Sequence, residues 1–167
     1  MTKREFIDAF YPYAKRTQDK TGIPALSILA QAAVESGWGE VCPGNMFFGV
    51  KDTDGINGNE QFLVTTEYSK NANVKFANII SVKPVVRNGS KWFKYTLKDY
   101  FRKYDTPEEC FTDHANFFIK NKRYAKALAV KNNVYQFIDA IAKAGYATDP
   151  NYANLLKGIA KNLEKLI

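Results

Sequence analysis

The sequence predicts an α+β fold that is mainly helical and carries one small antiparallel β insertion. Helix start signals occur near both ends of the chain, whereas residues 52–101 contain tight-turn dipeptides and residues that favour strands. The length of 167 residues is that of one domain, and 46% hydrophobic residues with 14% aromatic residues are typical of a folded globular protein. We therefore expect a single domain over residues 1–167, in which residues 52–101 form a β lobe between helical segments.

The first element is predicted to be a helix from about Lys3 to Lys20. Thr2 and Glu5 have the spacing of a capping box, in which each residue satisfies a free backbone N–H of the other. Pro12 is expected to bend this helix, and the Thr-Gly pair at 21–22 ends it.

The second helix, which Pro24 can open, carries the most informative stretch, ILAQAAVESGWG at residues 28–39. Its apolar stripe repeats at the spacing of a core-facing helix: Leu26, Leu29, Ala30 and Ala33. Glu35 lies off this stripe, just before the Ser-Gly-Trp-Gly break. It shares a neighbouring, largely apolar face with Ile28, Gln31 and Ala32. A largely apolar setting raises the pKa of a carboxyl, which suits a general acid beside a cleft. The alternative is a solvated glutamate near a helix C-terminus.

The middle of the chain is predicted to form a small antiparallel sheet. Asn57-Gly58 and Asn88-Gly89 are tight-turn dipeptides, and residues 61–68 and 82–97 are rich in Val, Thr, Phe, Tyr and Trp. The segment 70–78 is polar and without pattern, so we expect a loop there.

Helices are predicted again in the last third of the chain. Thr106-Pro107 with Glu109 supplies an N-cap, a first-turn proline and a capping-box glutamate. Asn133 opens a further helix that Gly145 closes, and Asp149-Pro150 opens the last one.

Charge is distributed unevenly along the chain. The net charge is +7, and between Lys70 and Lys103 nine Lys and Arg residues stand against one acid, Asp99. Such a stretch favours a polyanionic partner, either nucleic acid or an anionic bacterial envelope, or else forms a plain solvated basic surface.

Several classes of protein and site are excluded by what the sequence lacks. No apolar run approaches the roughly 20 residues of a membrane span, and the N-terminus has no signal-peptide core. Cys42 and Cys110 leave open one disulfide or two free thiols, and His114, the one histidine, is interpreted as structural. Without a metal cluster, a phosphate-binding glycine loop or a dinucleotide motif, we expect no cofactor and no metal.

Four blocks of the sequence together resemble a known family. They are ILAQAAVESGWG at 28–39, NMFFGVK at 45–51, YFRKYDTPEECFTDHANFF at 100–118 and AGYATDPNYAN at 144–154. This combination resembles the bacterial cell-wall N-acetylglucosaminidases of glycoside hydrolase family 73. The resemblance implies a lysozyme-like helical domain with a small β-hairpin lobe across a cleft. It also implies endo-β-N-acetylglucosaminidase activity, which is hydrolysis of the β-1,4 bond after N-acetylglucosamine in peptidoglycan.

The resemblance also assigns the catalytic candidates. Glu35 falls on the family's general acid, and Tyr146 falls on its tyrosine beside the reacting sugar. The best match for a second carboxylate on the β lobe is Glu67, with Glu60 in reserve. A retaining, inverting or substrate-assisted mechanism stays open, because these differ in the carboxyl separation or in use of the substrate's own acetamido group.

Substrate-binding candidates lie in the same blocks. Aromatic faces suit stacking against sugar rings, although each aromatic alone is equally compatible with core packing. The substrate-binding candidates are Trp38, Asn45, Phe48, Asp149 and Tyr152.

We expect a monomer that acts on peptidoglycan glycan strands in the periplasm or outside the cell, and not on nucleic acid. The missing signal peptide fits release of a phage lysin by another factor, or a trimmed chain. Two enzymatic alternatives are a lytic transglycosylase and a muramidase acting on the same substrate. A third alternative is a non-catalytic basic module that binds cell wall or nucleic acid.

Overall fold

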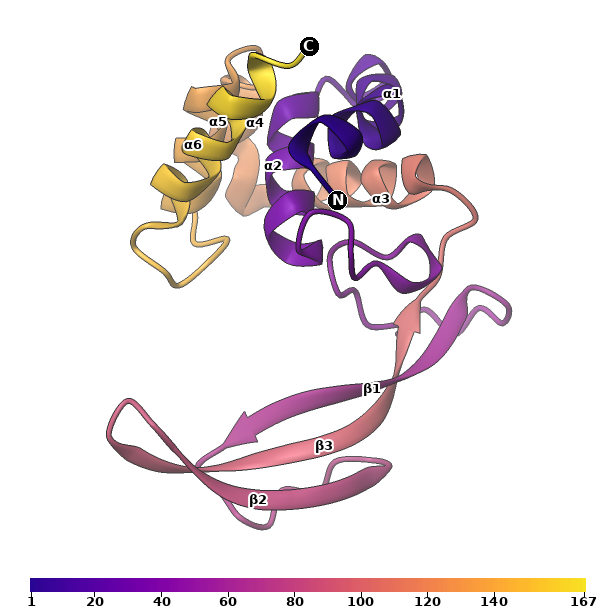
Figure 1. Cartoon of the computed structure of the whole chain (residues 1–167), viewed down its shortest axis with the longest axis vertical. Coiled ribbons are helices and arrows are strands. Elements are labelled where there is room, and N and C mark those ends of the chain that lie inside the picture. The colour runs from indigo at the N-terminus through magenta and orange to yellow at the C-terminus, as the bar shows by residue number, and fades with distance from the viewer. The chain divides into compact units, whose positions relative to one another are not determined.

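The computed structural model describes all residues from Met1 to Ile167, and its contacts divide the chain into two compact units (Figure 1). The helical unit comprises Met1–Phe48 and Tyr104–Ile167, and the β unit comprises Gly49–Lys103. The predicted fold class, α+β and mainly helical, is confirmed. None of the helices combines the length and the apolar character that crossing a bilayer would require.

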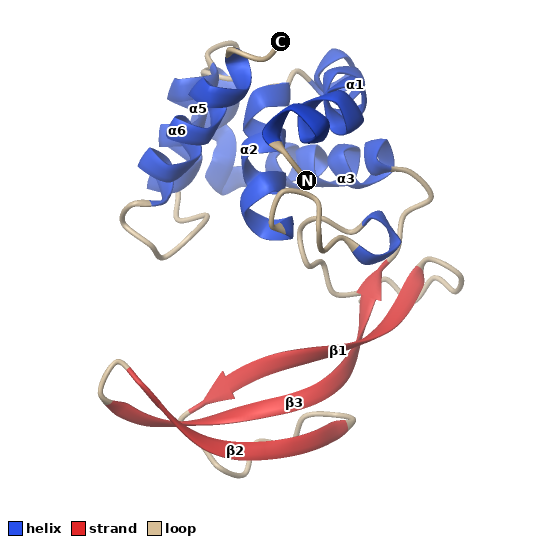
Figure 2. Cartoon of the chain, in the orientation of Figure 1, coloured by secondary structure: helices blue, strands red, loops and turns tan.

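Six α-helices build the helical unit (Figure 2). In chain order they are α1 (Lys3–Thr21), α2 (Ala25–Ser36), α3 (Pro107–Lys120), α4 (Ala125–Ala129), α5 (Val134–Lys143) and α6 (Tyr152–Glu164). Short 3-10 turns at Pro43–Asn45 and Lys122–Tyr124 connect some of them. The short helix α4 had no signal in the sequence, because five residues are too few to establish a helical period.

Capping contacts fix the starts of α1 and α3. The Thr2 hydroxyl accepts from the Glu5 N–H at 3.2 Å, and the Glu5 carboxylate accepts from the Thr2 N–H at 2.7 Å, which is the predicted capping box. At α3 the Thr106 hydroxyl accepts from the Glu109 N–H at 3.2 Å. The predicted capping box would have the Glu109 carboxylate accept from the Thr106 N–H. In the structure it accepts from the preceding residue instead, the Asp105 N–H, at 3.0 Å.

Helix α2 forms the centre of the helical unit, and its residues are buried on almost every side. Pro24 is the N-cap, one position earlier than predicted, and Gly22 ends α1 in the left-handed conformation at φ 77°. Ala30 of α2 packs in one cluster with Ile138 of α5 and Leu156 of α6. Aromatic rings fill the space on the α1 and α3 side: Phe6, Phe10, Phe47 and Phe111.

The β unit is a three-stranded antiparallel sheet in the order β1-β3-β2. Its strands are β1 (Glu60–Ser69), β2 (Ile79–Arg87) and β3 (Ser90–Arg102). The predicted hairpin at Asn88-Gly89 is confirmed: both residues have positive φ, at 51° and 74°, and Arg87 pairs with Ser90. The sequence alternation places Phe62, Val64, Thr66 and Tyr68 on one face of β1 and Leu63, Thr65 and Glu67 on the other.

The predicted loop at residues 70–78 lies against one face of the sheet. The Tyr95 hydroxyl donates to the Asn71 carbonyl at 2.5 Å and accepts from the Val74 N–H at 3.1 Å. The Phe76 ring packs edge-on against the Tyr95 ring, with 5.1 Å between centroids. This segment therefore covers Tyr95, which lies on the sheet face that also holds Leu97 and Glu67.

Both cysteines are free thiols, which resolves the open choice. Burial raises the pKa of the Cys110 thiol to about 12, so the group stays protonated and packs as a small apolar side chain.

We predict that Thr106→Ala lowers the free energy of unfolding by about 1 kcal/mol, because it leaves an N-terminal N–H of α3 unsatisfied. Denaturant unfolding followed by circular dichroism measures the change. Thr53→Ala, at an exposed loop position without a capping contact, is the matched control and should leave stability unchanged. Equal stability of the two variants would contradict a capping role for Thr106.

Candidate active site

Glu35 lies in the last turn of α2, and the chain turns sharply directly after it. The Ser36 hydroxyl donates to the Ala32 carbonyl at 2.5 Å and accepts from the Gly39 N–H at 2.8 Å. Gly37, Trp38 and Gly39 all have positive φ, at 58°, 61° and 80°. Such a run is unfavourable for the non-glycine Trp38, and it is the kind of local strain that is concentrated at functional sites.

The Glu35 carboxyl makes no hydrogen bond or ion pair with the rest of the chain. The side chain is solvent-exposed, but neighbouring protein atoms displace water from around its carboxyl. This desolvation raises the pKa of Glu35 above the ordinary glutamate value of 4.5, as the sequence predicts. The negative end of the α2 dipole acts in the same direction. A carboxyl that is partly desolvated, unpaired and still accessible is well suited to hold and donate a proton.

Tyr146 lies in the loop between α5 and α6, near the carboxyl. Its ring stacks on that of Tyr152 with 5.7 Å between centroids and 17° between planes. Desolvation raises the pKa of the Tyr146 hydroxyl, and repulsion from Tyr152 and Glu35 adds to the effect. This hydroxyl has no hydrogen-bond partner within the protein, so it remains protonated and available to a ligand.

A buried chain of hydrogen bonds lies one turn before Glu35. The Gln31 amide nitrogen donates to the Tyr152 hydroxyl at 3.1 Å, and the Gln31 carbonyl oxygen lies 2.8 Å from His114 Nε2. Since an amide oxygen only accepts, His114 must carry its proton on Nε2. Burial lowers the pKa of His114 to about 3, so the ring is neutral.

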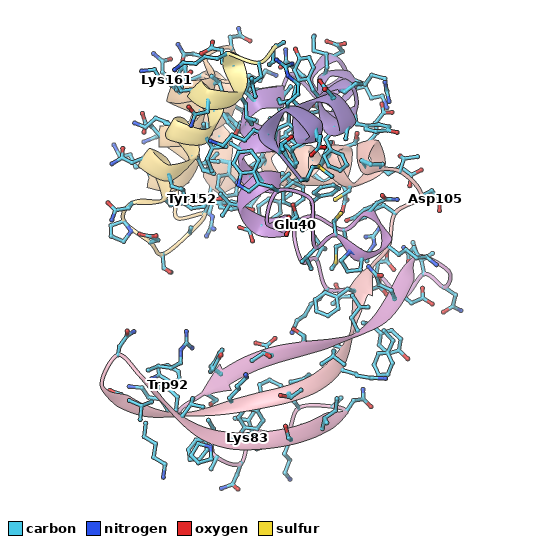
Figure 3. The ribbon with its side chains drawn as sticks, in the orientation of Figure 1. Glu40, Lys83, Trp92, Asp105, Tyr152 and Lys161 are labelled. Carbon is cyan, nitrogen blue, oxygen red and sulfur yellow. The ribbon has the colours of Figure 1, made fainter.

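The same series of hydrogen bonds determines the direction in which the Tyr152 hydroxyl donates. Because this oxygen accepts from Gln31, its own proton is free to be donated to another group. Desolvation raises the pKa of Tyr152 to about 12, so the hydroxyl is a neutral donor. Tyr152 is labelled on α6 in Figure 3.

Two predicted substrate-binding aromatics have defined contacts in the helical unit. The Phe48 ring stacks on His114, with 3.7 Å between centroids and 12° between planes. Trp38 packs edge-on against Phe6 at 5.4 Å, and the Lys3 ammonium lies 5.5 Å from its ring centroid. Phe48 therefore belongs to the cluster around His114, whereas Trp38 belongs to the contact with α1.

The two predicted polar binding residues hold backbone in the structure. The Asn45 amide nitrogen donates to the Tyr104 carbonyl at 3.0 Å, and Asn45 has φ 56°. The Asp149 carboxylate accepts from the Asn151 N–H at 2.8 Å, just before α6 begins. These contacts shape the loops, and direct binding by either residue stays a prediction.

Glu67 and Glu60 belong to the β unit. Glu67 lies near the C-terminal end of β1 and forms an ion pair with Lys51 at 2.9 Å. Lys51 also lies 3.1 Å from Asp99. The hydrogen bond that Lys51 donates to Glu67 is the main reason that the pKa of Lys51 is raised. Glu60, at the start of β1, accepts from the Gly58 N–H at 2.8 Å.

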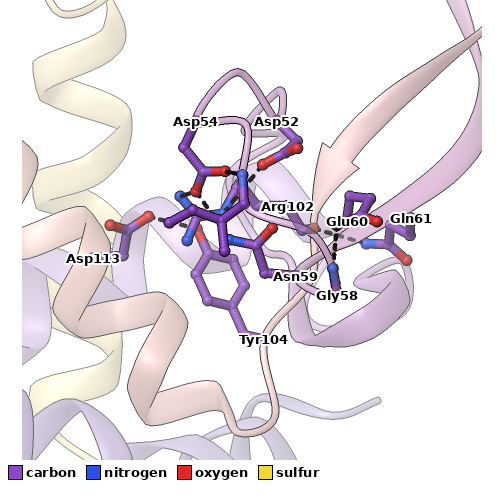
Figure 4. Close-up of polar contacts among 10 residues, drawn as sticks. Asp52, Asp54, Gly58, Asn59, Glu60, Gln61, Arg102, Tyr104 and Asp113 are labelled. Carbon is purple, nitrogen blue, oxygen red and sulfur yellow. Dashed lines mark hydrogen bonds and ion pairs between the residues drawn. The ribbon is translucent and has the colours of Figure 1, made fainter.

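The start of β1 lies beside a compact polar cluster around Arg102 (Figure 4). The Arg102 guanidinium lies 3.3 Å from Asp54 and 3.7 Å from Asp52, and Asp54 also accepts from the Asn59 amide at 2.9 Å. Glu60 is thus next to a group of structural contacts, whereas Glu67 pairs with Lys51, which it shares with Asp99.

Sequence reasoning missed the role of Gln31 and gave His114 only a general structural role. The available signal was a glutamine within an otherwise apolar helix, one turn before the candidate acid. A buried amide requires partners, but their identity depends on tertiary packing that spacing does not reveal.

The chain matches the glucosaminidase family, described as mannosyl-glycoprotein endo-β-N-acetylglucosaminidase, over residues 11–165. The chain belongs to this family. The match confirms the resemblance that the four sequence blocks indicated.

Individual relatives agree with this assignment. The peptidoglycan hydrolase FlgJ of Pseudomonas aeruginosa is 30% identical, over 96% of this chain and 36% of that protein. The exo-glucosaminidase LytG of Bacillus subtilis is 28% identical, over 95% of this chain and 51% of that protein. This chain therefore spans about half of these relatives' length or less.

A solved structure is also similar throughout. The C-terminally truncated glycoside hydrolase domain of Salmonella typhimurium FlgJ is 31% identical and has a TM-score of 0.72. The similarity covers 98% of this chain and 99% of that domain.

We predict that the Glu35 carboxyl titrates above pH 4.5, because its charged form is desolvated and unpaired. Carbon-13 NMR of the glutamate carboxyls measures this titration. Glu5 is the internal control, since its hydrogen bonds with Thr2 lower its pKa. A Glu35 titration at or below that of Glu5 would contradict the desolvated setting.

Proposed function

We propose that this chain is a peptidoglycan hydrolase, an endo-β-N-acetylglucosaminidase that cleaves the β-1,4 bond after N-acetylglucosamine. The observation that carries the proposal is the unpaired, desolvated Glu35 carboxyl at the end of α2, within a chain of the glucosaminidase family. The relatives' names, peptidoglycan hydrolase and exo-glucosaminidase, support the substrate and the reaction class.

Glu35 acts as the general acid. Glycoside hydrolysis requires protonation of the leaving oxygen, and a carboxyl with a raised pKa retains the necessary proton near neutral pH better than an ordinary glutamate does. Nothing in the chain competes for that proton, because Glu35 has no hydrogen-bond partner in the protein.

The two tyrosines assist the reaction as neutral hydroxyls. Tyr146 borders the reacting sugar, and the Tyr152 proton is free because its oxygen accepts from Gln31. Both pKa values are raised, so neither hydroxyl ionises in the working pH range. Hydroxyl dipoles placed beside developing positive charge can stabilise an oxocarbenium-like centre.

Two groups can act as the base or nucleophile at the reacting carbon, in addition to the general acid Glu35. Glu67 is the better protein candidate, because its carboxylate is held in one position by Lys51. The substrate's own acetamido group is the alternative nucleophile. Glu60 is less suited, because its carboxylate is already committed to the turn at Gly58.

Substrate contacts complete the proposal. Phe48, rigidly stacked on His114, and Trp38 offer ring surfaces for sugars, while Asn45 and Asp149 shape the adjoining loops. The chain acts as a monomer on glycan strands of the cell wall, in the periplasm or outside the cell.

We predict that purified protein releases fragments from peptidoglycan sacculi and that Glu35→Gln abolishes the release, because an amide cannot donate the catalytic proton. Mass spectrometry of the products identifies the bond that is cut. Reducing-end N-acetylglucosamine on oligomeric fragments supports the proposal. Reducing-end N-acetylmuramic acid indicates a muramidase, anhydro sugars indicate a transglycosylase, and release of single terminal units indicates exo cleavage.

Glu40→Gln is the matched control for this experiment. Glu40 is five positions further along, is exposed and pairs with the N-terminal ammonium at 3.0 Å, so its amide should retain activity. Circular dichroism confirms that both variants fold. Undiminished lysis by folded Glu35→Gln would remove this residue from the mechanism.

We further predict that Glu67→Gln slows hydrolysis by on the order of 10²-fold or more if Glu67 is the base or nucleophile. If the acetamido group performs that step, Glu67→Gln should cost much less, and Tyr146→Phe should cost as much or more. Initial rates on one soluble glycan oligomer compare these variants with Glu60→Gln. A large loss confined to Glu60→Gln would show that the second carboxylate was assigned to the wrong end of β1.

A further inference from the structure

The β unit carries a set of cations on one face of its sheet that the proposed catalytic groups do not use. Register places Lys83 of β2 opposite Lys94 of β3, and Lys94 opposite Tyr68 of β1. Trp92 and Lys98 lie on the same side of β3 as Lys94, and Arg87 lies on the same side of β2 as Lys83. We call this surface the basic face: Tyr68, Lys83, Arg87, Trp92, Lys94 and Lys98.

The basic face is open to solvent and contains no acid that neutralises it. Lys83, Arg87 and Lys98 are exposed, and Tyr68 is 41% exposed. Two acids of β1 and β3, Glu67 and Asp99, lie on the opposite face, where both contact Lys51. None of the face's lysines forms an ion pair.

Two of these lysines face each other directly, which is unfavourable in the free protein. Paired residues of antiparallel strands have Cβ atoms about 4.5–5.5 Å apart, and like charges in such pairs destabilise the sheet. Lys83 and Lys94 are such a pair, and Lys98 follows Lys94 by roughly 13 Å along β3. The sheet thus concentrates positive charge on this face, which favours the binding of an anionic partner.

Aromatic side chains on this side of the sheet contact cations or each other. The Arg87 guanidinium carbon lies 3.9 Å from the centroid of Tyr68 and 5.6 Å from that of Trp92. The Phe62 ring stacks on Tyr100 at 4.6 Å, and the Lys98 ammonium lies 5.6 Å from its centroid. Single-stranded nucleic acids bind through bases stacked on free rings, so this arrangement favours a partner recognised mainly by its charges.

We propose that the basic face binds the free carboxylates of the peptide stems in peptidoglycan and so holds the enzyme on the wall through a surface separate from the helical unit. This inference rests on the proposed function, because it takes the substrate to be the partner. Peptidoglycan presents carboxylates at repeated intervals along a linear polymer. Lys83 and Lys94 would share one carboxylate, and Lys98 would reach the next carboxylate along the polymer. Lys83 and Trp92 of the basic face are labelled in Figure 3.

Co-sedimentation with purified sacculi tests the proposal, with Glu35→Gln as the background so that the wall is not digested. The triple change Lys83→Gln, Lys94→Gln and Lys98→Gln should weaken binding roughly tenfold, since each exposed ion pair contributes a fraction of that factor. The matched control removes three exposed lysines of the helical unit: Lys126, Lys161 and Lys165. An equal loss in the control would mean that net charge alone matters and would overturn the proposal.

Chemical treatment of the sacculi identifies the partner. Converting wall carboxylates to methylamides should reduce binding of the Glu35→Gln background to the level of the triple variant. Hydrofluoric acid, which removes phosphodiester-linked polymers, should leave binding of that background unchanged. Loss after hydrofluoric acid alone would assign the face to a phosphate polymer and overturn the carboxylate assignment. Tighter binding to a single-stranded oligonucleotide than to sacculi would overturn it as well.

Two further measurements keep the result interpretable. The triple variant should melt no lower than its background, because it relieves the repulsion between Lys83 and Lys94. If the triple variant melts lower, the single variants Lys98→Gln and Lys83→Gln replace it in the binding assay. Binding as tight as that of the background by both single variants would then overturn the proposal. Release of reducing ends by the unmodified chain is assayed separately, so a chain that binds but does not cleave counts only against the proposed function.

Discussion

The buried hydrogen-bond chain from His114 through Gln31 to Tyr152 is the interaction on which the arrangement around Glu35 depends. Gln31 is fully buried in α2, and an unsatisfied buried amide costs about 1–3 kcal/mol. Helix α3 supplies one partner and α6 the other, so a single side chain fixes α2 against both. The position of Tyr152 then determines that of Tyr146, whose ring stacks on it.

Local signals in the sequence were enough to predict most of the fold. The Thr2 capping box, the Asn88-Gly89 turn and the end of α1 at the Thr-Gly pair each depend on neighbouring residues, and the structure contains all three. The raised pKa of Glu35 was also predictable, because the face that it shares on α2 is largely apolar in the sequence itself.

What the sequence could not provide depends on contacts between distant segments. Gln31 and His114 are 83 positions apart, and no spacing rule links them. The structural contacts of Asn45 and Asp149 were likewise hidden, because a motif shows which residues recur and not which atoms they contact. The pairing of Lys51 with Glu67 requires the sheet register, which a one-residue shift would have changed completely.

The chain leaves the helical unit and returns to it at positions that are hydrogen-bonded to one another. The chain departs after Phe48 and returns at Tyr104, whose N–H donates to the Gly44 carbonyl at 2.9 Å and whose carbonyl accepts from the Asn45 amide. From the standpoint of the helical core, the β unit from Gly49 to Lys103 is one loop closed at its ends. Doubling the length of such a loop costs only about 0.6 kcal/mol of closure entropy. Insertions, deletions and exchanged hairpins should therefore accumulate in this segment during evolution, while the helix that carries the carboxyl keeps its packing. One hydrolytic core can in this way acquire different wall-contacting surfaces.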